Sequence, residues 1–248
     1  MNVKTISKIL ALVLITIGSS RALYADIYDA ARTNGLDQLK AMVKANPNIV
    51  FSRDALGESA LFLAVLKGHE DAVTFLLANH ADVNTTNNNG WSLLHCAALN
   101  GRSDLAELLI ADGADVNAQG SGVTPLDVAA DHGSTGVAEV LIAHKANLEA
   151  RDRHMGWTPL HTAVFNGQVA MAKLLVANNA DINAKDYRDM TPLFWAVIGG
   201  GKKTVYFLLI NHADVNVRDK DGETPLRYAV LHGHDDSVAL LRQYGGHE

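Results

Sequence analysis

The sequence predicts an all-α protein built from a tandem array of short helix pairs. Three observations predict this fold class. A motif seen most clearly at 157–167, WTPLHTAVFNG, recurs along the chain, a glycine closes each copy, and an apolar segment follows each glycine. Such a period is typical of solenoids, in which stacked repeats bury one continuous core. The motif anchors are Ser59, Ser92, Thr124, Thr158, Thr191 and Thr224, which lie 33, 32, 34, 33 and 33 residues apart.

Each motif has the features of a short first helix. Thr158 can accept backbone N–H bonds at the start of the helix, and Pro159 suits the first helical position because its missing N–H costs nothing there. Gly167 supplies the left-handed residue that ends the helix after about two turns. The equivalent glycines are Gly68, Gly101, Gly133, Gly200 and Gly233.

A second helix is predicted after each glycine. Met171, Leu174 and Leu175 are spaced i, i+3 and i+4, which places them on one helix face that can bury against the neighbouring repeats. The equivalent groups are Val73-Leu76-Leu77, Leu105-Leu108-Leu109, Val137-Val140-Leu141 and Val205-Leu208-Leu209, and Val238-Leu240-Leu241 comes near this spacing.

A 33-residue period with a T-P-L-H-x-A core resembles the ankyrin repeat, and the resemblance covers roughly residues 24 to 246. It implies an ankyrin repeat solenoid of about seven helix-turn-helix pairs with short β-hairpin fingers, in one domain spanning 26–248. It also implies that His95 and His161, at the T-P-L-H position, bridge backbone and hydroxyl groups. Repeats one to seven are expected near 26–53, 54–86, 87–118, 119–151, 152–185, 186–218 and 219–248.

Several turns depart from the family pattern. In the degenerate repeat one, we expect Gly35 to end the first helix. The finger at 119–122 is one residue short and that at 151–156 one residue long, so both should differ from the others. After the second helix the family's glycine survives as Gly113. At the equivalent left-handed position a non-glycine costs about 1 kcal/mol, and Asn less. The residues that replace it are His80, Lys145, Asn179 and His212.

Residues 1–25 are predicted to be a secretory signal peptide. Lys4 and Lys8 precede the apolar run 9–17, and small residues follow it. An uncleaved N-terminal anchor is the alternative, although the run is short for a transmembrane span. We therefore expect an exported protein, either periplasmic or secreted. Cys96, the only cysteine, is expected to be a small core residue.

Composition and motifs argue against catalysis and nucleic-acid binding. The net charge of −6 offers no basic field for a nucleic acid or an anionic membrane. Gly199-Gly200-Gly201 lacks the G-K-S/T of a phosphate-binding loop, and no G-x-S-x-G occurs. His232 and His234 are too few ligands for a metal. The sequence therefore predicts no enzyme, no cofactor and no metal site.

We expect the function to reside on a surface. By the resemblance, partners bind the concave side, formed by finger tips and by exposed residues near the end of each first helix. These positions are unusually apolar, which is typical of a protein or peptide binding site, and are interrupted in repeat four by Asp131 and His132. The predicted partner-binding residues are Trp91, Leu99, Asn100, Trp157, Phe165, Asn166, Met190, Ile198 and Leu231.

The same residues fit other interpretations. The apolar stripe could complete the core, as we expect Trp195 to do, or could join two copies of the chain. The binder could be an inhibitor or immunity-like protector of one enzyme in the exported compartment, for which the acidic net charge favours a basic partner. It could also be a secreted effector that acts on host proteins.

Overall fold

The computed structural model describes residues 27–248, and its regular structure is helical. Repeat one consists of a helical segment at 27–32, helix α2 (Leu36–Ala45) and the 3-10 helix η1 (Pro47–Phe51). The predicted all-α class of helix pairs is confirmed. The pairs that follow are α3 (Ala60–Lys67) and α4 (Glu70–Ala78), α5 (Leu93–Leu99) and α6 (Ser103–Ala111), α7 (Pro125–His132) and α8 (Thr135–Ala143), α9 (Pro159–Phe165) and α10 (Val169–Ala177), α11 (Pro192–Ile198) and α12 (Lys202–Ile210), and α13 (Pro225–Leu231) and α14 (Asp235–Gln243).

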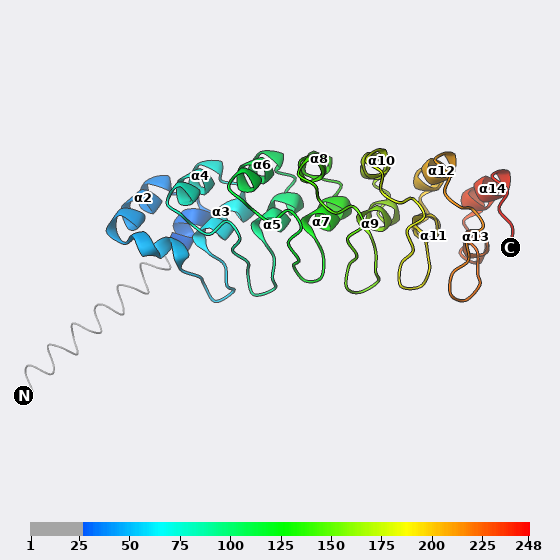
Figure 1. The fold of residues 1–248 in the computed structure, drawn as a ribbon, viewed down its shortest axis with the longest axis horizontal. Helices are drawn as coiled ribbons and strands as arrows, with labels where there is room; N and C mark the ends of the chain where they lie inside the picture. The colour runs from blue at the N-terminus through cyan, green and yellow to red at the C-terminus, as the bar shows by residue number, and fades with distance from the viewer. Residues whose placement is uncertain (1–26) are drawn as a thin grey trace, which may run out of the picture. The chain divides into compact units, whose positions relative to one another are not determined.

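The chain divides into two compact units. The first contains residues 27–93 and 112–114, and the second contains 94–111 and 115–248. In the first unit, α3 and α2 both pack against α4. Within the second unit, the first helices α7, α9, α11 and α13 pack side by side, and so do the second helices α6, α8, α10, α12 and α14 (Figure 1). Each repeat of that unit thus buries its apolar face against its neighbours.

The helix starts follow from the capping residues of the motif. The Ser59 hydroxyl accepts the Phe62 N–H at 3.1 Å, and the Thr124 hydroxyl accepts the Asp127 N–H at 3.2 Å. A proline occupies the first helical position of α7, α9, α11 and α13. The chain then leaves the first helix through a left-handed glycine such as Gly167, whose φ is 69°. These features confirm the predicted boundaries of the first helices.

Left-handed residues also end the second helices, as predicted. Gly113 has a φ of 96°, and the residues at the equivalent positions have φ values of 65° to 69°. In repeat one the prediction for Gly35 is wrong, because Asn34 takes the left-handed position with a φ of 57°. Gly35 has a φ of −74° and precedes α2. Asn is among the non-glycine residues that tolerate this conformation best, which explains the one-residue shift.

The fingers are short turns with little strand pairing. Among the described residues the pairing consists of isolated bridges, such as Gly120 with Val123. In this short finger Ser121 and Gly122 both have positive φ, of 53° and 86°, and the Val123 N–H donates to the Gly120 carbonyl at 3.1 Å. This is the geometry of a type I′ turn, which needs one residue fewer than the other fingers.

The remaining expectations concern the N-terminus and the cysteine. The predicted signal peptide, residues 1–25, lies outside the described residues. Within 27–248, no helix combines the length and the apolar character needed to cross a membrane. Cys96 is fully buried in α5, which confirms its assignment to the core.

Replacing Lys145 with glycine tests the cost of the left-handed turns. Lys145→Gly should raise the free energy of unfolding by about 0.5–1 kcal/mol because it relieves a strained backbone, and Asn179→Gly should raise it less. Glu139→Gly, at an exposed site inside α8, is the control and should lower stability by about 1 kcal/mol. Denaturant titration measures all three. A loss of stability in Lys145→Gly would contradict the account.

Candidate functional site

A buried polar link joins repeat five to the finger of repeat six. The Nδ1 of the buried His161 accepts the Thr158 backbone N–H at 3.1 Å and lies 2.8 Å from the Thr158 hydroxyl oxygen. Because a backbone N–H can only donate, the ring proton lies on Nε2, which donates to the Met190 carbonyl at 3.2 Å. Burial lowers the pKa of His161 to about 4, so its ring is neutral at pH 7.

His95 makes the corresponding link in repeat three. Its Nε2 lies 3.1 Å from the carbonyl oxygen of Val123, in the next finger. Burial lowers the pKa of His95 as well. Both rings are completely covered, so neither is accessible to a substrate. The bridge that the resemblance implies is confirmed in full for His161, and its backbone side is confirmed for His95.

Repeat four has Asp127 at this position, and its carboxylate makes only the contacts with the Thr at the start of its own helix. Its Oδ2 accepts the N–H and the hydroxyl of Thr124 at 2.8 and 2.7 Å. Its Oδ1 is buried and accepts no hydrogen bond from any residue in 27–248. Burial raises the pKa of Asp127 to about 6, because the ionised carboxylate loses its hydration in the core. The unpaired Oδ1 receives no hydrogen bond in place of the lost water.

The aromatic rings of repeats five and six form a packed cluster. The ring centroids of Trp157 and Trp195 are 4.6 Å apart, and Phe165 lies 5.2 Å from Trp157 and 5.9 Å from Trp195. Trp195 is only 7% exposed, and its indole N–H donates to Asp186 Oδ2 at 2.8 Å. The assignment of Trp195 to the core is therefore confirmed. Trp157 is half-buried, and Phe165 forms the outer edge of the cluster.

Three apolar residues, Phe165, Ile198 and Leu231, are the last residues of α9, α11 and α13 and form what we call the apolar ridge. Leu231 is 61% exposed, Phe165 is 38% exposed, and Ile198 is half-buried. The same position in repeat four is Asp131, whose Oδ1 accepts the Asn166 side-chain N–H at 2.7 Å. The ridge therefore ends at repeat four with a polar contact.

The sequence comparison agrees with this architecture. The family model described as ankyrin repeats in three copies matches residues 27–120, 118–186 and 187–248. The chain belongs to the ankyrin repeat family. No curated protein matches the chain in sequence. Ankyrin repeats generally mediate protein–protein interaction and are typically not catalytic. Among residues 27–248, no three side chains of His, Cys, Asp or Glu gather where they could hold a metal ion.

In this ankyrin array, most of the predicted contact residues reach the surface at least in part. Asn100 and Asn166 are exposed, and Trp91 and Leu99 are half-buried. Trp91 belongs to the first compact unit and Leu99 to the second, so we do not combine them into one surface. These residues remain predicted contacts.

The prediction for Met190 is wrong, because its side chain has no exposed surface. Met190 occupies the register of Trp91 and Trp157, immediately before the Thr or Ser anchor, and both tryptophans are half-buried there. The other residues in this register, Glu58, Val123 and Glu223, are half-buried as well, so Met190 is the one that is fully covered. Met190 therefore belongs to the ankyrin core.

The fingers contribute exposed residues that the sequence analysis did not select. Met155 and Tyr187 are 36% and 51% exposed. They lie at the tips of consecutive fingers, where the Tyr187 N–H donates to the Met155 carbonyl at 3.0 Å. Met155 lies three residues after Asp152 and Tyr187 one residue after Asp186, so no common spacing in the sequence marks them.

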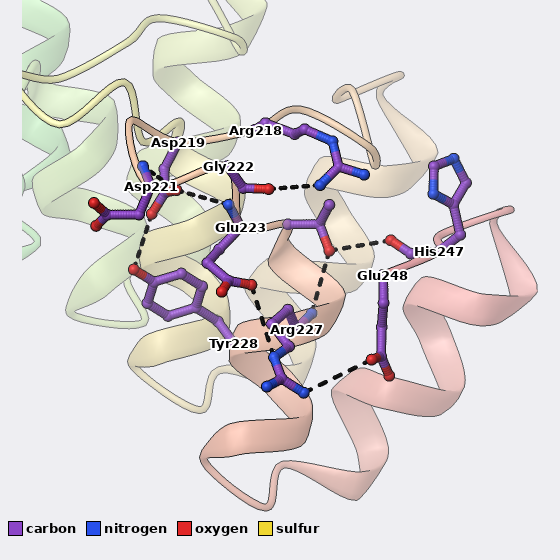
Figure 2. A network of polar contacts seen from close by, with 10 residues as sticks. Arg218, Asp219, Asp221, Gly222, Glu223, Arg227, Tyr228, His247 and Glu248 are labelled. Carbon is purple, nitrogen blue, oxygen red and sulfur yellow. Dashed lines mark hydrogen bonds and ion pairs between the residues drawn. The ribbon is translucent and has the colours of Figure 1, made fainter.

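The finger aspartates turn inward to hold the ankyrin fingers closed. Asp152 Oδ1 accepts the Met155 N–H at 2.7 Å, and Asp186 Oδ1 accepts the Met190 N–H at 3.0 Å. Figure 2 shows the same arrangement in repeat seven, where Asp219 Oδ1 accepts two loop N–H groups and Oδ2 accepts the Tyr228 hydroxyl at 2.9 Å. These carboxylates are committed to the loops.

Asp127 should make the stability of the protein depend on pH. Its folded pKa of about 6 lies above the ordinary value of 3.8, so its contribution is full below about pH 4 and is lost as pH rises through 6. Asp127→Asn removes the titrating group. The free energy of unfolding of the variant minus that of the unsubstituted chain should therefore increase by about 2–3 kcal/mol between about pH 4 and pH 7. Denaturant titrations across this range measure the difference, and a constant difference would rule out the buried carboxylate as the cause.

Proposed function

We propose that this ankyrin array binds a protein or peptide partner on the apolar ridge of repeats five to seven and has no chemistry of its own. One observation carries the proposal. Phe165, Ile198 and Leu231 leave apolar surface uncovered at the ends of consecutive first helices of one compact unit. Exposed apolar residues that recur at one position of successive repeats are typical of a binding surface.

The ridge is not needed to hold the stack. Repeat four has Asp131 at the same position, and its neighbouring helices pack as those of the other repeats do. The ridge residues therefore gain little from folding, because much of Phe165 and Leu231 stays in water. Burial of this surface beneath a partner would stabilise the complex, as burial of apolar anchors does in protein interfaces.

The ridge is also held rigidly. A Cβ on Gly199 would lie 2.6 Å from the carbonyl oxygen of Phe165, so only glycine lets the ends of α9 and α11 approach so closely. The ring contacts of Phe165 with Trp157 and Trp195 restrain its side chain from below. A rigid surface loses little conformational entropy on binding, which favours affinity.

We also propose that the protein acts after export. The order of Lys4, Lys8 and the apolar run 9–17 supports this proposal. Binding to one enzyme as an inhibitor, or to host proteins as an effector, would use the same ridge. Either role adds a partner of particular identity to the binding function proposed here.

Ridge substitutions test the proposal. Phe165→Ser with Leu231→Ser should weaken retention of a partner from the native compartment by about tenfold or more, because two apolar anchors are lost. Tyr206→Ser, at a residue of α12 that is 48% exposed, is the matched control and should leave retention unchanged. Affinity purification with quantitative mass spectrometry measures both variants. Equal retention by the ridge variant and the control would rule out the ridge.

Trp157→Ala separates the ridge from the cluster beneath it. Because Trp157 contacts both Phe165 and Trp195, its truncation should lower the free energy of unfolding by about 3 kcal/mol. Leu231→Ser should lower it by less than about 1 kcal/mol, since Leu231 is mostly in water. Denaturant titration measures both changes. If Trp157→Ala had as small an effect as Leu231→Ser, the cluster would not be part of the core.

A further inference from the structure

The three fingers of repeats five to seven lie at 151–156, 185–190 and 218–223. They contain equal numbers of basic and acidic residues, six of each, but expose more of the basic ones. The basic residues are all exposed. Of the acidic residues, Asp186 and Asp219 are buried, Asp152, Asp189 and Glu223 are half-buried, and Asp221 is exposed. The basic residues are Arg151, Arg153, Lys185, Arg188, Arg218 and Lys220.

The inward turn of the aspartates has a physical cause. Each accepts N–H groups of its own loop, which would otherwise lack partners, so the carboxylates are fixed inside the fingers. The basic side chains have no such role in common. Arg153, Lys185 and Lys220 form no ion pair with any residue in 27–248. Exposed cations therefore outnumber exposed carboxylates on these fingers.

The cationic fingers form one connected face within the second unit. The Arg153 N–H donates to the Gly122 carbonyl, and the Lys220 N–H donates to the Arg188 carbonyl, both at 3.0 Å. Tyr187 packs over the preceding finger, because a Cβ on Gly156 would lie 2.5 Å from its ring. These contacts link successive tips into a surface that carries both charge and exposed apolar groups.

This face continues into the apolar ridge. Trp157 is the residue that follows the finger of repeat five. Its backbone N–H donates to Asp152 Oδ2 at 2.8 Å. Its ring lies 5.2 Å from Phe165, the first ridge residue. A bound segment that covers Phe165 therefore lies close to the base of a cationic finger.

We propose that the partner presents an extended acidic segment, whose apolar side chains cover the ridge and whose carboxylates contact Arg153, Lys185 and Lys220. The proposal rests on the function proposed above and adds the chemical class of the partner. It also reverses, at this site, the basic partner that the net charge of −6 favours. A polypeptide fits better than a nucleic acid, because the cations border apolar groups and the chain as a whole repels a polyanion.

Selection from a phage-displayed library of random peptides tests this proposal on the full-length chain. We expect the selected peptides to be enriched in Asp and Glu and to bind more weakly as salt is raised. The Arg153→Glu/Lys185→Glu/Lys220→Glu variant should weaken their binding by about tenfold or more. The control Lys173→Glu/Lys203→Glu/Arg242→Glu makes the same charge change at exposed residues of α10, α12 and α14 and should have little effect.

The outcomes separate the two proposals. Peptides that lack acidic enrichment, or that bind the finger variant as well as the control, would overturn the acidic partner and leave ridge binding intact. Peptides that bind Phe165→Ser/Leu231→Ser undiminished, or a selection that yields no binder, would overturn ridge binding as well. Oligothymidine or phosphatidylglycerol vesicles are the counter-probes. Tighter binding of either one than of the peptides, lost in the finger variant, would assign the cations to a polyanion and overturn the proposal.

Discussion

A single buried hydrogen-bonded link sets the register between a first helix and the finger that follows it. Apolar burial between stacked helices is strong but has no direction, so it does not by itself fix how a finger stands on its neighbour. The neutral ring of His161 supplies the direction, because it accepts from Thr158 on one side and donates to the Met190 carbonyl on the other. The Met190 carbonyl also accepts the N–H of Asp186, so the link and the finger share one atom.

The array does not use this link uniformly. In repeat six Phe194 replaces the histidine, and the hydroxyl of Thr191 is buried without a partner among the described residues. In repeat seven Arg227 replaces it and reaches Glu223 and Glu248, while the Thr224 hydroxyl donates to the His247 carbonyl at 3.0 Å (Figure 2). Residues 247 and 248 thus provide the partners for the polar groups of α13, the first helix of repeat seven. The restraint between successive repeats therefore differs along the chain.

The sequence was sufficient to predict the periodic features of the fold and insufficient to predict side-chain directions across repeats. Spacing located the helices, and the T-P-L-H match located the buried histidines, because both depend on local residue order. Burial of Met190 depends on how one finger meets the next, which no local pattern encodes. The same is true of Trp157 and Trp195, whose rings meet across two repeats. Gly35 was misplaced because Asn34 can also adopt the left-handed conformation.

The candidate site follows from these constraints. The inward aspartates leave an excess of exposed cations on the fingers, and the close approach at Gly199 brings the end of α9 beside α11. Neither feature is visible in the net charge of −6 or in the overall apolar content. A surface of this kind recognises a partner by shape and charge, which is the function that ankyrin repeats generally serve.

Hydrogen exchange of the chain, free and with a bound partner or selected peptide, tests the central claim most directly, because it reports where the partner lies without any substitution. The account predicts that binding slows exchange in the fingers at 151–156, 185–190 and 218–223 and at the ends of α9, α11 and α13. Exchange in α8, α10 and α12 should stay unchanged. Slower exchange confined to those second helices would contradict the account and place the binding surface on the opposite side of the repeats.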